Sequence, residues 1–233
     1  MKSKEKNNEY KLFNKLSEEW WDENGRFAVL HKIRPIRIQY ILKQLNNRKL
    51  KKLNILDIGC GGGLVSESLS KLGAKVTGID FVENNIRVAK QHAKILGLKI
   101  DYKIGDIENI LINKKFDVII IFEVLEHLNN WKTFINKIKN NLNADGLLII
   151  STINKNIFSK YIGIFLAEKI LRWIPEGTHE YNKFIKPEDL IYNFNDTELV
   201  LNDLTGLIFD PIELKWKLSK NTLINYFCSF KKN

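Results

Sequence analysis

Hydrophobic and polar positions follow a regular order between Leu53 and Asp80. An apolar run over 53–58 leads into four glycines, then into apolar residues at helical spacing over 64–72, and then into a second apolar run that ends at Asp80. Short apolar runs predict buried strands, and the spacing between them predicts an amphipathic helix. The stretch therefore predicts a strand, a glycine loop, a helix and a second strand, an arrangement typical of nucleotide-type sites.

The alternation of strands and helices continues beyond Asp80. The further expected elements are a helix over 86–97, strands over 100–104 and 116–122, a helix over 131–142, a strand over 147–152, and two last strands with their connection within 199–232. This order predicts an α/β fold with a mostly parallel, doubly wound sheet of seven strands and helices on both faces. Ligands of such sheets bind at the carboxyl ends of the strands.

We expect one domain made of five segments. These are a disordered tail over 1–9, an N-terminal helical cap over 10–50, a ligand-binding core over 51–152, an insertion over 153–190 and the C-terminal strands over 191–233. Within the cap, Asn24 and Gly25 are expected to end a first helix that begins at Tyr10. Pro35 suits the first turn of a second helix, because a first turn does not need its missing N–H.

The insertion contains a segment between Tyr161 and Ile174 that is apolar around most of a helical wheel. Glu168, Lys169 and Arg172 interrupt it on one arc. The segment falls short of the roughly 20 apolar residues that a membrane span requires. A core helix, a lid over a substrate and a helix lying in a membrane interface all fit the pattern, and the basic residues of the insertion favour the last two.

Composition narrows the class of protein. The chain has 233 residues, 44% of them hydrophobic, and a net charge of +10, which invites a nucleic-acid or anionic-membrane partner. The chain is also rich in Asn and Ile, as an AT-rich coding sequence would be, and it contains no zinc finger, arginine-rich arm or aromatic RNA-binding pattern, so we expect no nucleic-acid partner. Cys60 and Cys228 form no metal-binding pair, and with no secretory signal the chain is expected in the reducing cytoplasm.

The glycine spacing distinguishes between two cofactors. A dinucleotide fingerprint needs a third glycine where this chain has Leu64, which argues against a dehydrogenase. The pattern Asp-x-Gly-x-Gly-x-Gly over 57–63 instead resembles motif I of the class I S-adenosylmethionine (SAM) methyltransferases, which have a Rossmann-like fold. In that family the acid that ends the second strand binds the SAM ribose, here Asp80. Asp106, after the third strand, stands where this class often holds the adenine amino group, with a surface turn as the alternative.

Two carboxylates and an imidazole follow the strand at 116–122. If a helical turn begins there, Glu123, Glu126 and His127 share one face, at positions i, i+3 and i+4. Such a set can hold a divalent ion, with Mg²⁺ or Mn²⁺ suited to the oxygen ligands and Zn²⁺ or Fe²⁺ also open. Without a metal, Glu123 would hydrogen-bond the cofactor region and His127 would act as a general base.

Longer blocks from about Phe13 to the C-terminus resemble the ubiquinone biosynthesis O-methyltransferases. The blocks are WWDENGRFAVLHKIRPIR, LDIGCGGG, FEVLEHL, IPEGTHEYNKFIKPEDL and TGLIFDPI. The resemblance implies transfer of the SAM methyl group to a phenolate oxygen of polyprenyl catechol and demethylubiquinol intermediates, in both O-methylation steps. Another small-molecule or lipid phenol, or a non-catalytic SAM-binding role in a quinone-synthesis complex, are the alternatives.

The resemblance and the motif together assign site residues. The SAM-binding set is Arg37, Gly59, Gly61, Asp80, Asp106 and Phe122. The catalytic pair is His127 and Glu123. Glu123, Glu126 and His127 also match a Glu-x-x-Glu-His set that mitochondrial relatives use for a divalent ion, so Mg²⁺ or another such cation is expected there.

The implied substrate also suggests partners. A polyprenyl tail resides in a bilayer, so we expect a cytoplasmic protein attached peripherally to the anionic inner face of the cell membrane. Other proteins of ubiquinone biosynthesis are expected as possible neighbours. An RNA-methylating enzyme is disfavoured, because the Asn/Asp-Pro-Pro-Tyr stretch usual in nucleic-acid amino-methylating enzymes is replaced here by FEVLEH.

Overall fold

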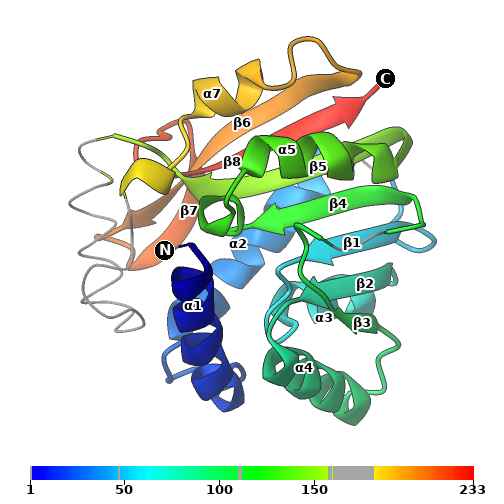
Figure 1. Cartoon of the computed structure of the whole chain (residues 1–233), viewed down its shortest axis with the longest axis vertical. Coiled ribbons are helices and arrows are strands. Elements are labelled where there is room, and N and C mark those ends of the chain that lie inside the picture. The colour runs from blue at the N-terminus through cyan, green and yellow to red at the C-terminus, as the bar shows by residue number, and fades with distance from the viewer. Residues whose placement is uncertain (1, 47, 110–111, 157–158, 160–180) are drawn as a thin grey trace.

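The computed structural model describes residues 2–46, 48–109, 112–156, 159 and 181–233, which fold around one sheet (Figure 1). The strands are β1 (Asn54–Ile58), β2 (Lys75–Asp80), β3 (Asp101–Ile104), β4 (Phe116–Phe122), β5 (Leu142–Ile153), β6 (Leu199–Asp210), β7 (Lys215–Ser219) and β8 (Asn225–Lys232). The α-helices are α1 (Lys2–Leu16), α2 (Ala28–Leu45), α3 (Leu64–Lys71), α4 (Glu83–Ile95), α5 (Trp131–Ile138) and α7 (Pro187–Tyr192). Short 3₁₀ turns are η1 (Ser17–Glu19), η2 (Leu125–His127), η3 (Lys139–Asn141) and η5 (Tyr181–Lys183).

The sheet has the order β3-β2-β1-β4-β5-β8-β6-β7. The first five strands of that order pair in parallel, whereas β8, β6 and β7 join through antiparallel pairs. The predicted α/β class is confirmed, but the described residues form eight strands and not seven. The extra strand is β7, which we expected to belong to a connection. Trp216 and Leu218 of β7 pack against the core on one face of the sheet, and β7 is the last strand of the sheet order, so it forms an edge.

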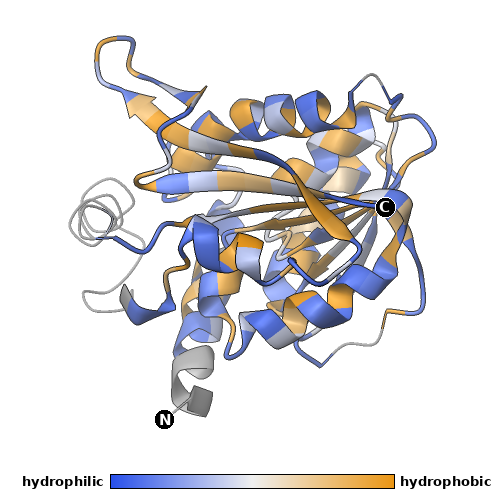
Figure 2. Cartoon of the chain, turned by 90° about the horizontal axis from the view of Figure 1, so that it is seen from above, coloured by the Kyte–Doolittle hydropathy of each residue, from blue (hydrophilic) through white to orange (hydrophobic). Residues whose placement is uncertain are grey.

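The core lies on both faces of the central strands. Along β4, Ile119 and Ile121 pack on the side covered by α5 and α7, and Val118 and Ile120 pack on the side covered by α2 and α3. Figure 1 shows the first pair of helices in front of the sheet and the second pair behind it, and Figure 2 shows the apolar strands between helices whose outer surfaces are hydrophilic. Burial on both faces explains why the strand reads as one continuous apolar run.

The N-terminal cap differs from the prediction in two places. Helix α1 begins at Lys2, so the disordered tail expected over 1–9 is wrong. Phe13 and Leu16 at the C-terminal end of α1 pack in a small apolar cluster, and a helix anchored at one end extends at low cost because propagation is easier than nucleation. Pro35 lies inside α2 and not in its first turn, because α2 already begins at Ala28.

The apolar segment at 161–174 lies outside the described residues. No helix in the described part of the chain is both long enough and apolar enough to cross a membrane.

Candidate active site

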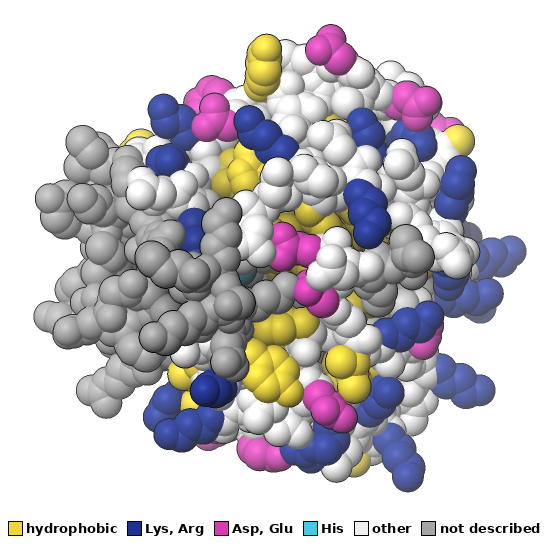
Figure 3. Space-filling view, viewed as in Figure 1, with side chains coloured by type: hydrophobic (Ala, Val, Ile, Leu, Met, Phe, Trp, Pro, Cys, Tyr) yellow, Lys and Arg dark blue, Asp and Glu magenta, His cyan; other side chains and the backbone are white. Residues whose placement is uncertain are grey.

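A cavity of about 300 Å³ lies at the carboxyl ends of the parallel strands. Its lining includes every residue that the sequence assigned to the site: Arg37, Gly59, Gly61, Asp80, Asp106, Phe122, Glu123, Glu126 and His127. Helix α1 lies beside this edge of the sheet (Figure 1) and contributes Glu9 and Phe13 to the lining. Acidic and hydrophobic side chains adjoin near the centre of the face drawn in Figure 3, while the lysines and arginines described there are mostly spread around its margin. The topology therefore brings the predicted residues together.

The glycine loop is held closely between two side chains. Gly59 and Gly61 have φ of +71° and +52°, a region that side chains disfavour. A Cβ on Gly59 would lie 2.3 Å from Cγ2 of Val124, and one on Gly61 would lie 2.4 Å from the Trp20 ring. Glycine is therefore required at both positions, because the backbone has a positive φ and because the neighbours leave no room for a side chain.

Asp80 ends β2 as predicted and fixes the loop that follows β1. Its Oδ2 accepts the Gly61 N–H at 2.9 Å, and its Oδ1 accepts the Val82 N–H at 2.8 Å and an Asn85 amide N–H at 3.3 Å. Burial raises the pKa of this carboxyl, while the hydrogen bonds oppose the rise. The carboxylate thus couples the glycine loop to the first turn of α4 and still faces the cavity.

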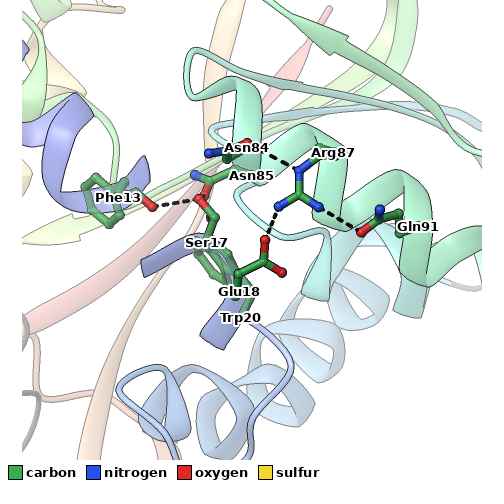
Figure 4. A network of polar contacts seen from close by, with 8 residues as sticks. All are labelled: Phe13, Ser17, Glu18, Trp20, Asn84, Asn85, Arg87 and Gln91. Atoms are coloured by element: carbon green, nitrogen blue, oxygen red, sulfur yellow. Dashed lines mark hydrogen bonds and ion pairs between the residues drawn. The ribbon is translucent and has the colours of Figure 1, made fainter. Parts of the chain in front are cut away.

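The N-terminal cap is fastened to α4 through Asn85 (Figure 4). Oδ1 of Asn85 accepts hydrogen bonds from the Ser17 hydroxyl at 2.9 Å and from the Trp20 indole at 2.8 Å. Arg87, two residues further along α4, donates to Glu18 and to Asn84, as Figure 4 also shows. One buried amide therefore connects the cap to Asp80 on its other side.

A second contact fastens the cap to the glycine loop. The Trp21 indole donates to the Gly62 carbonyl at 3.0 Å and stacks on His92, with ring centroids 3.4 Å apart. His92 in turn contacts the buried Glu67 carboxylate through Nδ1 at 2.8 Å. Both residues of the Trp20–Trp21 pair therefore make specific contacts with the glycine loop and α4.

Arg37 is a buried cation on α2 that faces the cavity. It forms an ion pair with Glu123, and its guanidinium lies 5.2 Å from the centroid of the Phe122 ring. Burial lowers its pKa to about 10, against the raising effect of the Asp57 and Glu126 charges, so the group stays cationic at neutral pH. Its buried Nε has no hydrogen-bond partner among the described residues, which leaves one donor for a ligand.

Glu123 does not begin a helical turn. Its φ is +49°, a left-handed conformation that is unusual for a residue with a side chain and is typical of functional sites. The Ser151 hydroxyl donates to Glu123 Oε1 at 2.6 Å, and the Glu123 N–H donates to the Ser151 carbonyl at 3.0 Å. The end of β5 thus holds this residue in place.

The predicted metal set is not assembled. Glu123 pairs with Arg37, Glu126 is buried and accepts a hydrogen bond from Thr152 at 2.9 Å, and Nδ1 of His127 lies 3.0 Å from Oε1 of Glu9. Within the described part of the chain, no three His, Cys, Asp or Glu side chains are placed to hold a metal ion. The helical spacing that would have put the three on one face is broken at Glu123, since only the 3₁₀ turn η2 follows it.

Asp106 lines the cavity and also makes the bonds of a turn. Its Oδ1 accepts the Glu108 N–H at 3.2 Å, and its Oδ2 accepts from the Asn109 amide at 2.9 Å. The turn alternative therefore describes its hydrogen bonds, and the role toward the adenine amino group stays a prediction.

Sequence reasoning missed Glu9, Asn85 and Ser151 as members of the site. Ser151 follows the apolar run of β5 and pairs with Phe122, the residue before Glu123, a position that could have pointed to it. Glu9 and Asn85 carry no such local signal, because the contacts of Glu9 with His127 and of Asn85 with the cap join distant parts of the chain.

The chain is similar to known methyltransferases along most of its length. A protein-family model described as a methyltransferase domain matches residues 49–210. A protein of Pelagibacter ubique (strain HTCC1062), named ubiquinone biosynthesis O-methyltransferase, is 44% identical over 97% of each chain. A protein of the same name from Rickettsia felis is 40% identical over 94% of this chain and 91% of the relative.

A solved structure shares the fold at low sequence identity. The magnesium protoporphyrin IX methyltransferase of Synechocystis PCC 6803, crystallised with bound SAH, superposes with a TM-score of 0.63. The two are 19% identical, and the match covers 86% of this chain and 83% of the other.

Proposed function

This chain belongs to the ubiquinone biosynthesis O-methyltransferases, which use SAM, and from that premise we propose that its cavity methylates a phenolic hydroxyl of polyprenyl catechol and demethylubiquinol, in both O-methylation steps. The observation that carries the proposal is the gathering of the glycine loop, Asp80, the Arg37–Glu123 pair and His127 around one cavity. Bound SAM would supply an electrophilic methyl group on sulfur.

The proposed SAM subsite is the part of the cavity next to the glycine loop. Gly59 and Gly61 would let the cofactor lie against the backbone, and the Asp80 carboxylate has acceptor capacity left for ribose hydroxyls. Asp106 would take the adenine amino group. Arg37 suits the carboxylate of the cofactor, because its buried Nε still needs an acceptor. Phe122, below the guanidinium, would shield this region from water.

The proposed chemistry is an in-line displacement. The substrate oxygen forms a bond to the methyl carbon as the bond from that carbon to sulfur breaks, and the phenol proton leaves. A phenol with a pKa of about 10 holds that proton at neutral pH, so a base is required. His127 lines the cavity and is proposed as the acceptor. Glu123, which contacts both Arg37 and Ser151, would hold the Arg37 guanidinium in position.

The test is methyl transfer from labelled SAM to a short-chain prenyl catechol and to the matching demethylubiquinol, with and without EDTA. We expect turnover on both substrates that EDTA does not change, because the candidate metal ligands have other partners in the structure. We expect His127→Ala to lose turnover and keep SAM affinity. Turnover on neither diol would overturn the proposed substrate. SAM binding without turnover on any phenol would favour the non-catalytic role, and turnover lost on chelation and restored by Mg²⁺ would overturn the metal-free chemistry.

We further propose that the protein is cytoplasmic and attaches peripherally to an anionic membrane through the basic, apolar part of 153–190. The support is the sequence of that segment and the bilayer location of a polyprenyl tail. Other ubiquinone-biosynthesis proteins are proposed neighbours, and nucleic acid is not a proposed partner. Co-sedimentation with vesicles should increase with anionic lipid and fall when Lys169 and Arg172 are changed to Glu, and sedimentation indifferent to both would contradict the attachment.

A further inference from the structure

Helix α1 supplies a carboxylate to the imidazole at the centre of the site. Oε1 of Glu9 lies 3.0 Å from Nδ1 of His127, across 118 positions of the chain. Both residues line the cavity. Their side chains are only partly exposed, 17% for Glu9 and 34% for His127. The contact therefore lies in the lining of the cavity, at a place that is open to solvent.

This contact determines which ring nitrogen can react. A carboxylate accepts only, so Nδ1 must carry the proton, and in the neutral ring Nε2 then has a free lone pair. No described residue forms a hydrogen bond with Nε2. Bases oriented by a carboxylate in this way occur in many unrelated enzymes.

Other charges also face the ring. The carboxylates of Glu9 and Glu126 and the ammonium group of Lys183 all act on its charge. The two carboxylates would stabilise the imidazolium that forms when Nε2 accepts a proton.

We propose that Glu9 is a positioning residue that holds His127 with Nε2 directed at the substrate hydroxyl. The proposal rests on the proposed function of His127 as the proton acceptor. As the oxygen–methyl bond forms and the sulfur–methyl bond breaks, the phenol proton moves to Nε2, the sulfur leaves as a neutral thioether, and Glu9 stabilises the imidazolium until water removes the proton. The cap thereby completes the catalytic site and does more than cover it.

The test compares Glu9→Gln and Glu9→Asp on two substrates. One is a prenyl catechol whose hydroxyl is protonated at the assay pH, and the other is a nitrocatechol that is already ionised there. With the first substrate, Glu9→Gln should lower kcat about 10- to 100-fold with KM for SAM changed less than about twofold, as expected for an impaired general base. With the second it should lower kcat less than about threefold, because no proton needs to be removed, and Glu9→Asp should restore part of the loss.

A matched control separates orientation of the base from loosening of the cap. Glu18→Gln removes the cap's ion pair with Arg87, which lies outside the cavity, and should leave kcat within about twofold on both substrates. Equal losses on both substrates, a loss in Glu18→Gln as large as in Glu9→Gln, or no loss in Glu9→Gln would overturn the proposal.

A measurement without turnover distinguishes this proposal from the proposed function. Nitrogen-15 shifts of the His127 ring, identified by their absence in His127→Asn, should show the proton on Nδ1 in the unchanged protein and a mixture of tautomers in Glu9→Gln. An Nε2 proton in the unchanged protein would refute the role of Glu9. If the Nδ1 proton is present but neither diol is methylated, the proposed substrate is what has failed.

Discussion

The indole N–H of Trp20 donates to Oδ1 of Asn85 at 2.8 Å, and the amide of Asn85 donates to Asp80 at 3.3 Å. One side chain thus contacts both the cap and the acid assigned to the ribose. We therefore expect SAM binding at Asp80 and the contact of the cap with α4 to stabilise each other, since coupling between two sites is reciprocal.

We predict that Asn85→Ala destabilises the protein and weakens SAM binding. The change leaves the buried Trp20 indole without its acceptor, at a cost of about 1–3 kcal/mol for a buried unsatisfied group, while the Ser17 hydroxyl keeps the Phe13 carbonyl at 2.8 Å. Urea unfolding and SAM titration measure the two effects. Asn84→Ala is the control, because it removes only an exposed hydrogen bond of 3.3 Å with Arg87 and should change the unfolding free energy by less than about 0.5 kcal/mol. Equal effects of the two substitutions would contradict this account of the network.

Gly61 and Gly97 both have a positive φ, but only at Gly61 would an added Cβ collide with a neighbour, so alanine at the two positions distinguishes backbone strain from steric overlap. Gly97 has φ of +66° and nothing within 4 Å of an added Cβ, so Gly97→Ala should cost only about 1–2 kcal/mol of backbone strain. Gly61→Ala meets the Trp20 ring as well and should cost at least about 1 kcal/mol more, through overpacking, and abolish SAM binding. Chemical denaturation and titration give both numbers. SAM binding retained in Gly61→Ala would argue against close approach of the cofactor at the loop.

Asp57 should make the stability depend on pH. Burial raises its pKa from 3.8 to about 6, although the Ser66 hydroxyl donates to it at 2.6 Å. Between about pH 4 and 6 the folded state binds a proton that the unfolded chain has released, so stability falls as pH rises through this window. Asp57→Asn should therefore stabilise the ligand-free protein at pH 7.5, by up to about 3 kcal/mol at 1.4 kcal/mol for each pKa unit, and lose this advantage near pH 3.5.

The control for that pH dependence is Asp101→Asn on β3, where the carboxylate is exposed. It should leave the slope of stability against pH nearly unchanged. A constant difference between Asp57→Asn and the unchanged protein from pH 3.5 to 7.5 would exclude the ionisation of Asp57 as the cause.

Breaking the Arg37–Glu123 ion pair should lower the free energy of unfolding. The Arg37 side chain is 7% exposed, so Glu123→Gln removes the ion-pair partner of a buried cation. Such a change typically costs about 3–5 kcal/mol at a fully buried site, and it should cost less here because Glu123 is 28% exposed and the charges of Asp57 and Glu126 remain. Glu213→Gln, which removes a surface pair with Lys215, should change the unfolding free energy by less than about 1 kcal/mol. Thermal and urea unfolding report both. An unfolding free energy unchanged in Glu123→Gln would mean that solvent stabilises the Arg37 cation in place of the carboxylate.

Much of the site follows from the sequence because its signals are local. The glycine loop and Asp80 are fixed by the spacing of one strand-helix-strand unit, and parallel strands necessarily bring their carboxyl ends together. Glu9 could not be predicted, since its partner is 118 positions away and its own neighbours are polar and charged. The metal set failed for a different reason, because helical spacing was assumed where Glu123 adopts a left-handed backbone.

Because β7 is the last strand of the sheet order, its side chains and backbone form the edge that another molecule's strand could pair with. An open edge exposes unpaired backbone groups that can template aggregation, and charged side chains along it discourage such pairing. β7 carries Lys215 and Lys217 on one outer edge, and β3 carries Asp101 and Lys103 on the other. The lysines on either side of Trp216 therefore discourage edge-to-edge pairing of β7 with a strand of a second molecule.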